Sequence, residues 1–98
     1  MARYQVYDNP ADSGYLLDVQ SNWLNDLDSR VVVPLLPTSI TEPATRLNPV
    51  FKVKGQNHVM LTQSLAAFPV NELNTPVTDL SGSFDKITSA LDMLFHGF

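Results

Sequence analysis

Residues 18–35, DVQSNWLNDLDSRVVVPL, are the stretch of the chain that decides its fold. Its last part, RVVVPL, is rich in β-branched and apolar residues and, with the leucine that follows, predicts a β-strand. Pro34 cannot donate a backbone hydrogen bond, so we expect this strand at a sheet edge or with a bulge at that residue. The segment before it, SNWLNDLDS, is polar and predicts a long loop, whose apolar residues either turn inward or face a partner: Trp23, Leu24 and Leu27.

Further strands are expected on both sides of this stretch. Towards the N-terminus, RYQVY and YLLDVQ flank the turn-like DNPADSG and predict a first antiparallel pair. Towards the C-terminus, residues 38–49 form a proline-punctuated connection. VFKVK and HVMLTQSLAAF then flank GQN, where Gly55 and Asn57 tolerate positive φ, and this pattern predicts a hairpin. FPVNEL and PVTDL either extend the sheet or lead out of it.

From Phe84 onward the apolar period changes from two residues to about 3.6, which predicts one amphipathic helix. Ser81 or Ser83 can cap its start, and Gly97 suits the C-terminal position where positive φ is required. The fold class is therefore mainly β with one C-terminal α-helix, in a single domain over residues 1–98. The predicted apolar stripe of the helix consists of Phe84, Ile87, Ala90, Leu91, Leu94 and Phe95.

The composition favours a protein partner over nucleic acid. Only 16% of the residues are charged, below the roughly 25% of an average globular chain, so the surface must expose many uncharged or apolar side chains. In a chain of 98 residues this favours a permanent partner, most simply a second copy in a homodimer. The net charge is −4 and the lysines and arginines are scattered along the sequence, so we expect no direct binding of nucleic acid.

The residue content also indicates a cellular location. The chain has no cysteine, so neither disulfides nor thiolate metal sites can hold the fold, and a reducing cytosol suits it. The start, MARYQVYDNP, lacks the apolar segment of a signal peptide, and no apolar run approaches the roughly 18 residues of a membrane span. We therefore expect a cytoplasmic protein that is not embedded in a membrane.

Catalytic and metal-binding patterns are nearly absent from the sequence. His58 and His96 are far apart, without metal-ligand spacing, and are interpreted as a strand residue beside a turn and a solvated residue at the helix end. Asp26 and Asp28 lie in a polar loop that gives no reason to expect shifted pKa values. No catalytic serine motif or phosphate-binding glycine loop is present. The sequence thus predicts no cofactor, no metal and no enzymatic activity.

Two side chains stand out as candidates for binding. Trp23 is the only tryptophan of the chain, and tryptophan is enriched at binding hot spots, although the ring could equally anchor the loop in the core. Met93 projects opposite the apolar stripe of the helix, with His96 about one turn further along, and an adaptable methionine beside an imidazole can form a contact surface.

Several stretches together resemble one known family. YQVYDN, DVQSNWLNDLDSRVVVPL, MLTQSLAAFPV, VTDLS and ALDMLFHGF resemble, in order and at matching spacing, the CcdB family of plasmid and chromosomal toxins. The resemblance covers essentially the whole chain. It implies an SH3-like barrel of the CcdB/MazF type with a small additional sheet and a C-terminal helix, dimeric through its sheet face.

The resemblance also implies a function. Such toxins bind the dimerisation region of the DNA gyrase A subunit, trap the enzyme on cleaved DNA, and catalyse nothing themselves. They are neutralised by the disordered C-terminal part of a cognate CcdA-like antitoxin.

A set of site residues follows from the same resemblance. Members of the family grip gyrase with their last residues, typically Trp-Gly-Ile, and the matching positions here keep the glycine but not the tryptophan. Trp23 matches an aliphatic loop position that faces gyrase in relatives. The implied gyrase-binding residues are Ser21, Trp23, Leu24, Asp92, Met93, His96, Gly97 and Phe98.

Two other functions remain open at this point. The chain could be a non-toxic or weakly toxic relative that binds its antitoxin and co-regulates its operon, because the terminal tryptophan is missing. It could also be a MazF-like endoribonuclease, which would require a positively charged cleft with a placed arginine and a serine or threonine. Arg30 and Arg46 are the only loop-adjacent candidates for such an arginine. For the tail, the alternative is that Phe98 packs back on its own helix.

Overall fold

Strand β3, Ser29–Pro37, is the centre of the sheet in the computed structural model, which describes residues 2–40 and 45–98. β3 pairs on one side with β2, Tyr15–Asp18, and on the other side first with β6 and then with β5. The sheet continues beyond β2 to β1 and β7 and beyond β5 to β4, all pairings being antiparallel. The outer strands are β1 (Gln5–Asp8), β4 (Val50–Val53), β5 (Gln56–Met60), β6 (Ala66–Pro69) and β7 (Thr78–Asp79).

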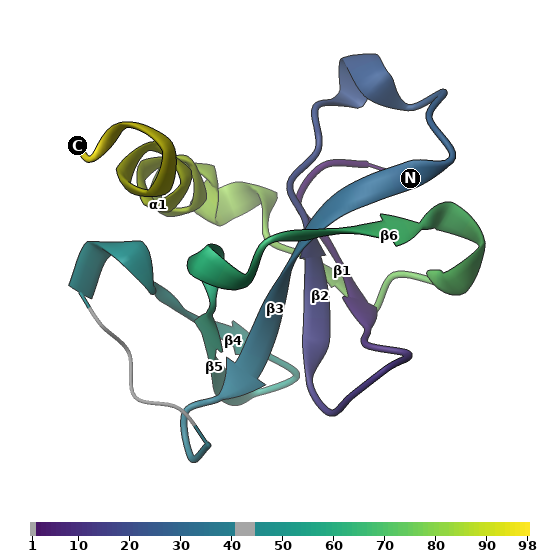
Figure 1. The fold of residues 1–98 in the computed structure, drawn as a ribbon. Coiled ribbons are helices and arrows are strands. Elements are labelled where there is room, and N and C mark those ends of the chain that lie inside the picture. Colours follow the sequence, from purple (N-terminus) through teal and green to yellow (C-terminus); the bar gives the residue numbers. More distant parts are fainter. Residues whose placement is uncertain (1, 41–44) are drawn as a thin grey trace.

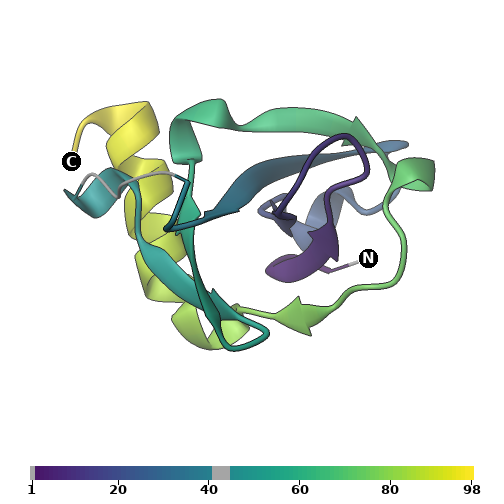
Figure 2. The same ribbon diagram turned by 90° about the horizontal axis from the view of Figure 1, so that it is seen from below.

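The described residues thus form seven strands and one C-terminal helix, as the fold class predicted (Figure 1). Seen from below, the strands curl into a nearly closed barrel with helix α1, Phe84–His96, packed at one side (Figure 2). All seven strands belong to one sheet, so the small additional sheet expected from the resemblance is not separate: β6 branches from the main path by pairing with β3. Residues 41–44 of the proline-punctuated connection lie outside the described residues.

Pro34 lies in a central strand, so the expectation of an edge strand was wrong. It pairs with Leu16 of β2, and its carbonyl accepts a hydrogen bond from the Leu61 backbone N–H on the opposite side of β3. The N–H and C=O groups of a strand residue point to the same side, so the missing N–H of Pro34 also faces away from β2. On that side β6 ends its pairing at Val32 and β5 begins at Leu35, so the proline occupies the gap between two partners.

The β4–β5 hairpin is confirmed, but its turn and its second strand differ from the prediction. Lys54 and Gly55 carry the positive φ values, 52° and 79°, whereas Asn57 lies within β5 opposite Lys52. A two-residue turn with both φ values positive matches the twist of the flanking strands. HVMLTQSLAAF is two elements, because the chain turns through a 3₁₀ turn at Thr62–Ser64 after β5 and then forms β6 on a different part of β3.

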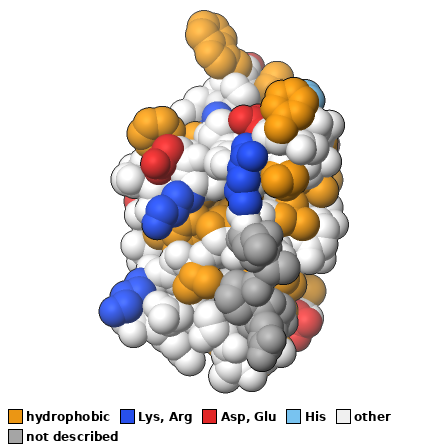
Figure 3. Space-filling view, turned by 90° about the vertical axis from the view of Figure 1, so that its left-hand side faces the viewer, with side chains coloured by type: hydrophobic (Ala, Val, Ile, Leu, Met, Phe, Trp, Pro, Cys, Tyr) orange, Lys and Arg blue, Asp and Glu red, His pale blue; other side chains and the backbone are white. Residues whose placement is uncertain are grey.

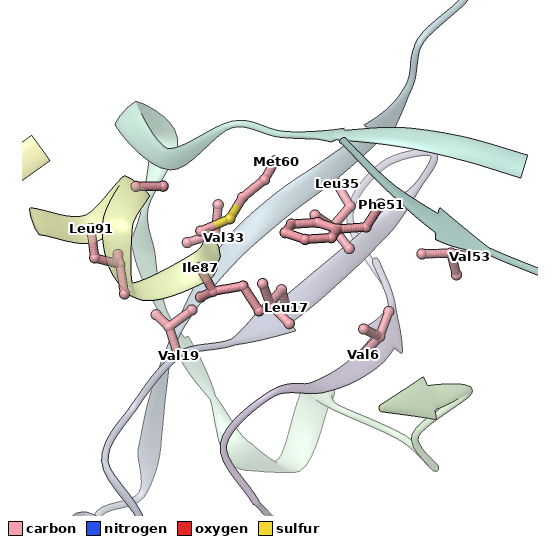
Figure 4. Close-up of a cluster of buried hydrophobic side chains, with 11 residues drawn as sticks. Val6, Leu17, Val19, Val33, Leu35, Phe51, Val53, Met60, Ile87 and Leu91 are labelled. Carbon is pink, nitrogen blue, oxygen red and sulfur yellow. The ribbon is translucent and has the colours of Figure 1, made fainter. Parts of the chain in front are cut away.

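The main core lies between the inner face of the barrel and α1 (Figure 4). The helix contributes Ile87, Ala90 and Leu91, which are all buried. Phe84 and Phe95, predicted on the same stripe, are 57% and 62% exposed, so the buried part of the stripe is narrower than the apolar pattern. The barrel contributes Val6, Leu17, Val19, Val33, Leu35, Phe51, Val53 and Met60.

The helix ends partly as predicted. Gly97 adopts φ 81° and donates its N–H to the Met93 carbonyl, 3.0 Å away, which terminates the helix in the left-handed conformation that glycine favours. The expected serine cap was wrong, because Ser83 precedes the helix without a side-chain capping bond. The Asp79 carboxylate instead accepts hydrogen bonds from the Ser81 hydroxyl and from the Ser81 backbone N–H, and both lower the pKa of that exposed group.

A second, smaller cluster covers the other face of the central strands. It contains Tyr7, Leu16, Val32 and Leu73, with Phe68 packed against it. Because side chains alternate along a strand, β1, β2 and β3 send successive apolar residues to opposite clusters. The continuous run VVV in β3 therefore serves two cores rather than one.

Truncating Ile87 to alanine tests the role of α1 in the main core. Ile87 is fully buried, so we expect Ile87→Ala to lower the free energy of unfolding by about 2–5 kcal/mol. Chemical denaturation measures it, with Lys86→Ala at the neighbouring exposed position expected to stay within about 0.5 kcal/mol. Equal effects of the two variants would show that the helix is not packed as described.

Candidate functional site

A buried ion pair joins β2 and β3, the two strands that the long loop connects. The Arg30 side chain in β3 donates from Nε to Asp18 Oδ2 at 2.8 Å and from Nη2 to Asp18 Oδ1 at 2.9 Å. Both side chains are almost wholly inaccessible to solvent. The Gln20 backbone N–H also donates to Asp18, so the carboxylate is well satisfied. Such a bidentate pair fixes geometry as well as charge.

The ion pair is continued by hydrogen bonds into the loop itself. Arg30 Nη1 donates to Asn25 Oδ1 at 2.7 Å. The Gln20 side chain donates to the Leu24 carbonyl at 2.8 Å and accepts from the Val31 backbone N–H at 3.0 Å. The loop is therefore tied to the barrel at both of its ends.

Within the loop, Ser21 and Trp23 form the start of a 3₁₀ turn, Asn22–Leu24. The Ser21 hydroxyl accepts from the Trp23 backbone N–H at 3.2 Å and caps the turn. Trp23 is 95% exposed, so the interpretation of the ring as a core anchor was wrong and the loop presents it to solvent. Leu24 and Leu27 are also about half exposed. Asp26 and Asp28 are exposed loop residues, as expected.

The buried environment of the ion pair also affects Tyr7. Burial, with a smaller contribution from the charge of Asp18, raises the pKa of the Tyr7 hydroxyl, and Arg30 partly opposes this shift. The hydroxyl donates to Gln5 Oε1 at 2.9 Å. Tyr7 therefore remains neutral and structural at physiological pH.

The helix end presents a second set of exposed residues. His96, Gly97 and Phe98 are exposed, and Phe98 retains 77% of its accessible surface. Its ring lies beside that of His96, with centroids 6.2 Å apart and planes tilted by 37°. The alternative in which Phe98 packs back on its own helix therefore holds at most for this contact with His96, because most of the Phe98 ring is open to solvent. Met93 is half-buried on the helix.

A groove of about 470 Å³ lies between the loop and the helix. Of the residues implied by the resemblance, Ser21, Leu24 and Asp92 line it together; Trp23, Met93 and the three tail residues do not. The rest of the lining consists of residues that the sequence analysis did not assign to a site: Arg3, Val19, Gln20, Val31, Leu65, Thr88, Leu91 and Phe95. The spacing of Thr88, Leu91, Asp92 and Phe95 places them on one helix face and could have identified this wall.

A second groove, of about 560 Å³, lies on another side of α1 and gathers basic residues that the sequence suggested were scattered. Arg46 and Lys86 both line it, with Asp85, Ser89, Pro49 and Val50. Arg46 Nε donates to Ser89 Oγ at 2.6 Å. Figure 3 shows Lys and Arg side chains beside hydrophobic ones on this face of the molecule. Arg30, the other arginine considered for a cleft, is buried in its ion pair and is unsuited to that role.

The segment that carries Arg46 is anchored to the barrel. Asn48 is buried and donates to the Met60 carbonyl and to Gln63 Oε1, at 2.9 and 2.7 Å. The Thr62 hydroxyl donates to the Leu47 carbonyl at 2.6 Å. These bonds hold the 3₁₀ turn Thr45–Leu47 against the end of β5.

The two histidines lie in different parts of the structure. His58 is buried in β5, with Nδ1 2.8 Å from the Gln56 carbonyl and its ring edge-on to Tyr15. His96 is exposed at the end of α1. Within residues 2–40 and 45–98, no three metal-ligating side chains come together. In the same part of the chain, no helix has the length and apolar character needed to cross a membrane.

Two of the solved structures that are similar to this fold are endoribonucleases. An endoribonuclease from a mycobacterial species in complex with its cognate antitoxin matches with a TM-score of 0.78 and 19% identity, over 95% of this chain and 92% of that one. An endoribonuclease from a mycobacterial species matches with a TM-score of 0.78 and 20% identity, over 95% and 88%. At these identities the likeness shows the barrel fold alone. The class that the fold defines is a small, nearly closed β-barrel with one C-terminal helix.

The family is then fixed by the sequence itself. A family model described as CcdB protein matches residues 3–97. The chain therefore belongs to the CcdB family, as the resemblance indicated, and is a toxin-type member of a toxin–antitoxin system.

Breaking the Asp18–Arg30 pair tests whether it holds the loop. Arg30→Met leaves a buried carboxylate without its cation, so we expect the free energy of unfolding to fall by about 3–5 kcal/mol. The double variant Asp18→Leu/Arg30→Met should be more stable than Arg30→Met, because no lone charge remains buried. Denaturant titration of the three proteins measures this. A cost below about 1 kcal/mol for Arg30→Met would contradict the role given to the pair.

Proposed function

We propose that this chain is a homodimeric cytoplasmic toxin that acts by binding and catalyses no reaction. Its target is the dimerisation region of the DNA gyrase A subunit, which it holds so that gyrase stays on cleaved DNA. A disordered segment of a cognate antitoxin neutralises it. The antitoxin partner is supported by the family and by the antitoxin-bound state of the similar mycobacterial endoribonuclease.

The exposure of Trp23 and Phe98 is the observation that carries the proposal. An isolated chain that leaves 95% of a tryptophan and 77% of a terminal phenylalanine accessible gains almost no stability from either ring. Both stand at positions that face gyrase in relatives, one on a hydrogen-bonded loop and one after a helix-ending glycine. Aromatic anchors on ordered supports are typical of binding hot spots.

The substitution of the usual terminal tryptophan by His96 is compatible with this function. The imidazole offers less stacking area than an indole, but the neighbouring Phe98 ring, at 6.2 Å, adds apolar surface to the same tip. Trp23 supplies an indole on the loop, where relatives carry an aliphatic residue. The total aromatic area is thus redistributed rather than lost.

Titration against a gyrase A dimerisation fragment tests the proposal. We expect the wild-type chain to bind, Phe98→Ala and Trp23→Ala each to weaken binding by roughly thirtyfold, and His96→Trp to tighten it. Thermal midpoints should change little, because each ring is exposed. Isothermal titration calorimetry and thermal unfolding on the same samples measure both quantities.

Two results would contradict this prediction in different ways. A wild-type chain that binds its antitoxin but not the gyrase fragment is the non-toxic relative considered above. A Phe98→Ala variant that loses many degrees of thermal midpoint and no gyrase affinity would show that this ring serves the fold.

An endoribonuclease activity is the second candidate, favoured by the groove around Arg46. Arg46, Lys86 and the Ser89 hydroxyl provide a cationic surface with a hydroxyl for a phosphate group, and Asp85 is a carboxylate beside it. This meets the requirement for a placed arginine with a serine. The two similar solved structures bear the name endoribonuclease.

Incubation with single-stranded RNA separates this candidate from the first. If the groove cleaves RNA, Arg46→Gln should abolish cleavage while Trp23→Ala leaves it unchanged, as the tryptophan lies outside the groove. Gel analysis of the RNA measures it. Under the binding proposal, none of the proteins cleaves RNA.

A further inference from the structure

Arg3 is a cation placed in the wall of the apolar groove between the loop and α1. Its side chain is half-buried, and its Nε is buried without a hydrogen-bond partner among the described residues. A buried donor left unsatisfied is unfavourable, so such atoms call for an explanation. No described carboxylate lies within ion-pair distance of the guanidinium.

The surrounding structure holds Arg3 in this place. Its backbone N–H donates to Asn22 Oδ1 of the loop at 2.8 Å. Its guanidinium carbon lies 4.9 Å from the centroid of the Tyr4 ring, in cation–π contact. Tyr4 has φ 76°, a left-handed conformation that is unfavourable for a tyrosine. Its backbone is fixed there by bonds to Asp18 and Leu80, at 2.7 and 2.9 Å.

The groove around Arg3 combines apolar walls with one open cationic group. Leu24, Leu65, Leu91 and Phe95 supply apolar surface from three separate segments. The one carboxylate in the described lining, Asp92, makes no ion pair with Arg3. A guanidinium that is stacked on a ring and lacks a carboxylate partner is already oriented to donate two parallel hydrogen bonds to the carboxylate of a ligand.

We propose that this groove receives a segment of the gyrase A subunit that carries an apolar side chain beside a carboxylate, and that Arg3 pairs with that carboxylate. The proposal rests on the proposed function, because gyrase is its partner. The groove is continuous with the gyrase-facing set through Ser21, Leu24 and Asp92, which line it. Arg3 is thus a specificity-determining residue: it selects a ligand segment by its carboxylate, whereas the aromatic rings contribute apolar contact.

Affinity for the gyrase A dimerisation fragment at two salt concentrations tests this pairing. We expect Arg3→Gln to weaken binding by about thirtyfold at low salt, with a smaller dependence on salt than wild type, because an ion pair is lost. Arg3→Lys should recover part of the affinity, since it keeps the charge but not the planar fork. Lys52→Gln, which removes a charge from an exposed strand residue outside both grooves, should stay within about twofold.

The outcomes separate this inference from the proposed function. If wild type binds the fragment and Arg3→Gln binds equally well with the same salt dependence, the pairing is wrong and gyrase binding stands. If wild type does not bind the fragment, both the proposed function and this inference are wrong. If Arg3→Gln sediments as a monomer where wild type is a dimer, or loses affinity for the antitoxin alone, the groove belongs to that other partner. Thermal unfolding of Arg3→Lys checks that the fold is kept.

Discussion

The buried pair of Asp18 and Arg30 is the constraint on which the arrangement of the surface depends. Its two members stand at the end of β2 and the start of β3, where the chain leaves and re-enters the barrel. Withdrawing two charges from water is costly, and the cost is offset only when geometry and additional hydrogen bonds are good. Here the bonds from Gln20 N–H and to Asn25 and the Gln20 carbonyl supply them. The same bonds shape the loop, so the fold and the presentation of Trp23 share one cause.

The sheet around this pair is used on both faces, which determines how much surface remains for binding. β1, β2 and β3 contribute side chains to two hydrophobic clusters, one that includes residues of α1 and one that includes Leu73 and Phe68. A chain of 98 residues that fills two cores has few apolar residues to spare. Most of the large apolar side chains that remain exposed lie in the loop or along α1 to its end, namely Trp23, Leu24, Leu27, Phe84, Phe95 and Phe98, whereas Ile40 and Val50 are exposed elsewhere. The loop and α1 therefore carry most of the large apolar side chains that the described residues leave exposed.

The elements of the fold were predictable from the sequence, but several of their partners were not. The β-branched run of β3, the first strand pair and the 3.6-residue period of α1 each depend on local chemistry, which the sequence contains. The place of Pro34 could not be predicted, because it depends on β6 and β5 meeting the same side of β3 at different residues. The single sheet and the split of HVMLTQSLAAF have the same origin in long-range pairing.

The candidate site shows the same division. The three tail residues are adjacent in the sequence, and they and Trp23 occupy positions that the resemblance indicated; in the structure all four are exposed. Arg3 lies 18 residues before Ser21 along the chain, and only the folded barrel brings it into the groove with that residue. Arg46 and Ser89 likewise meet through a tertiary contact with no sequence signal. Local sequence patterns thus identify the exposed aromatic residues, whereas the positions of Arg3 and Arg46 in their grooves depend on the tertiary fold.

Helix α1 contributes one face to the core and another to the wall of the groove. Its buried stripe ends with Leu91, while the face through Thr88, Asp92 and Phe95 lines the groove. Gly97 then turns the chain out of the helix, so Phe98 adds nothing to the packed interior. Leu91 belongs to both the core and the groove wall, but the tail residues after Phe95 are exposed, so we expect substitutions there to change the stability little. The position of His96 is therefore free to vary with the partner, while Ile87 and Ala90 are fixed by the barrel.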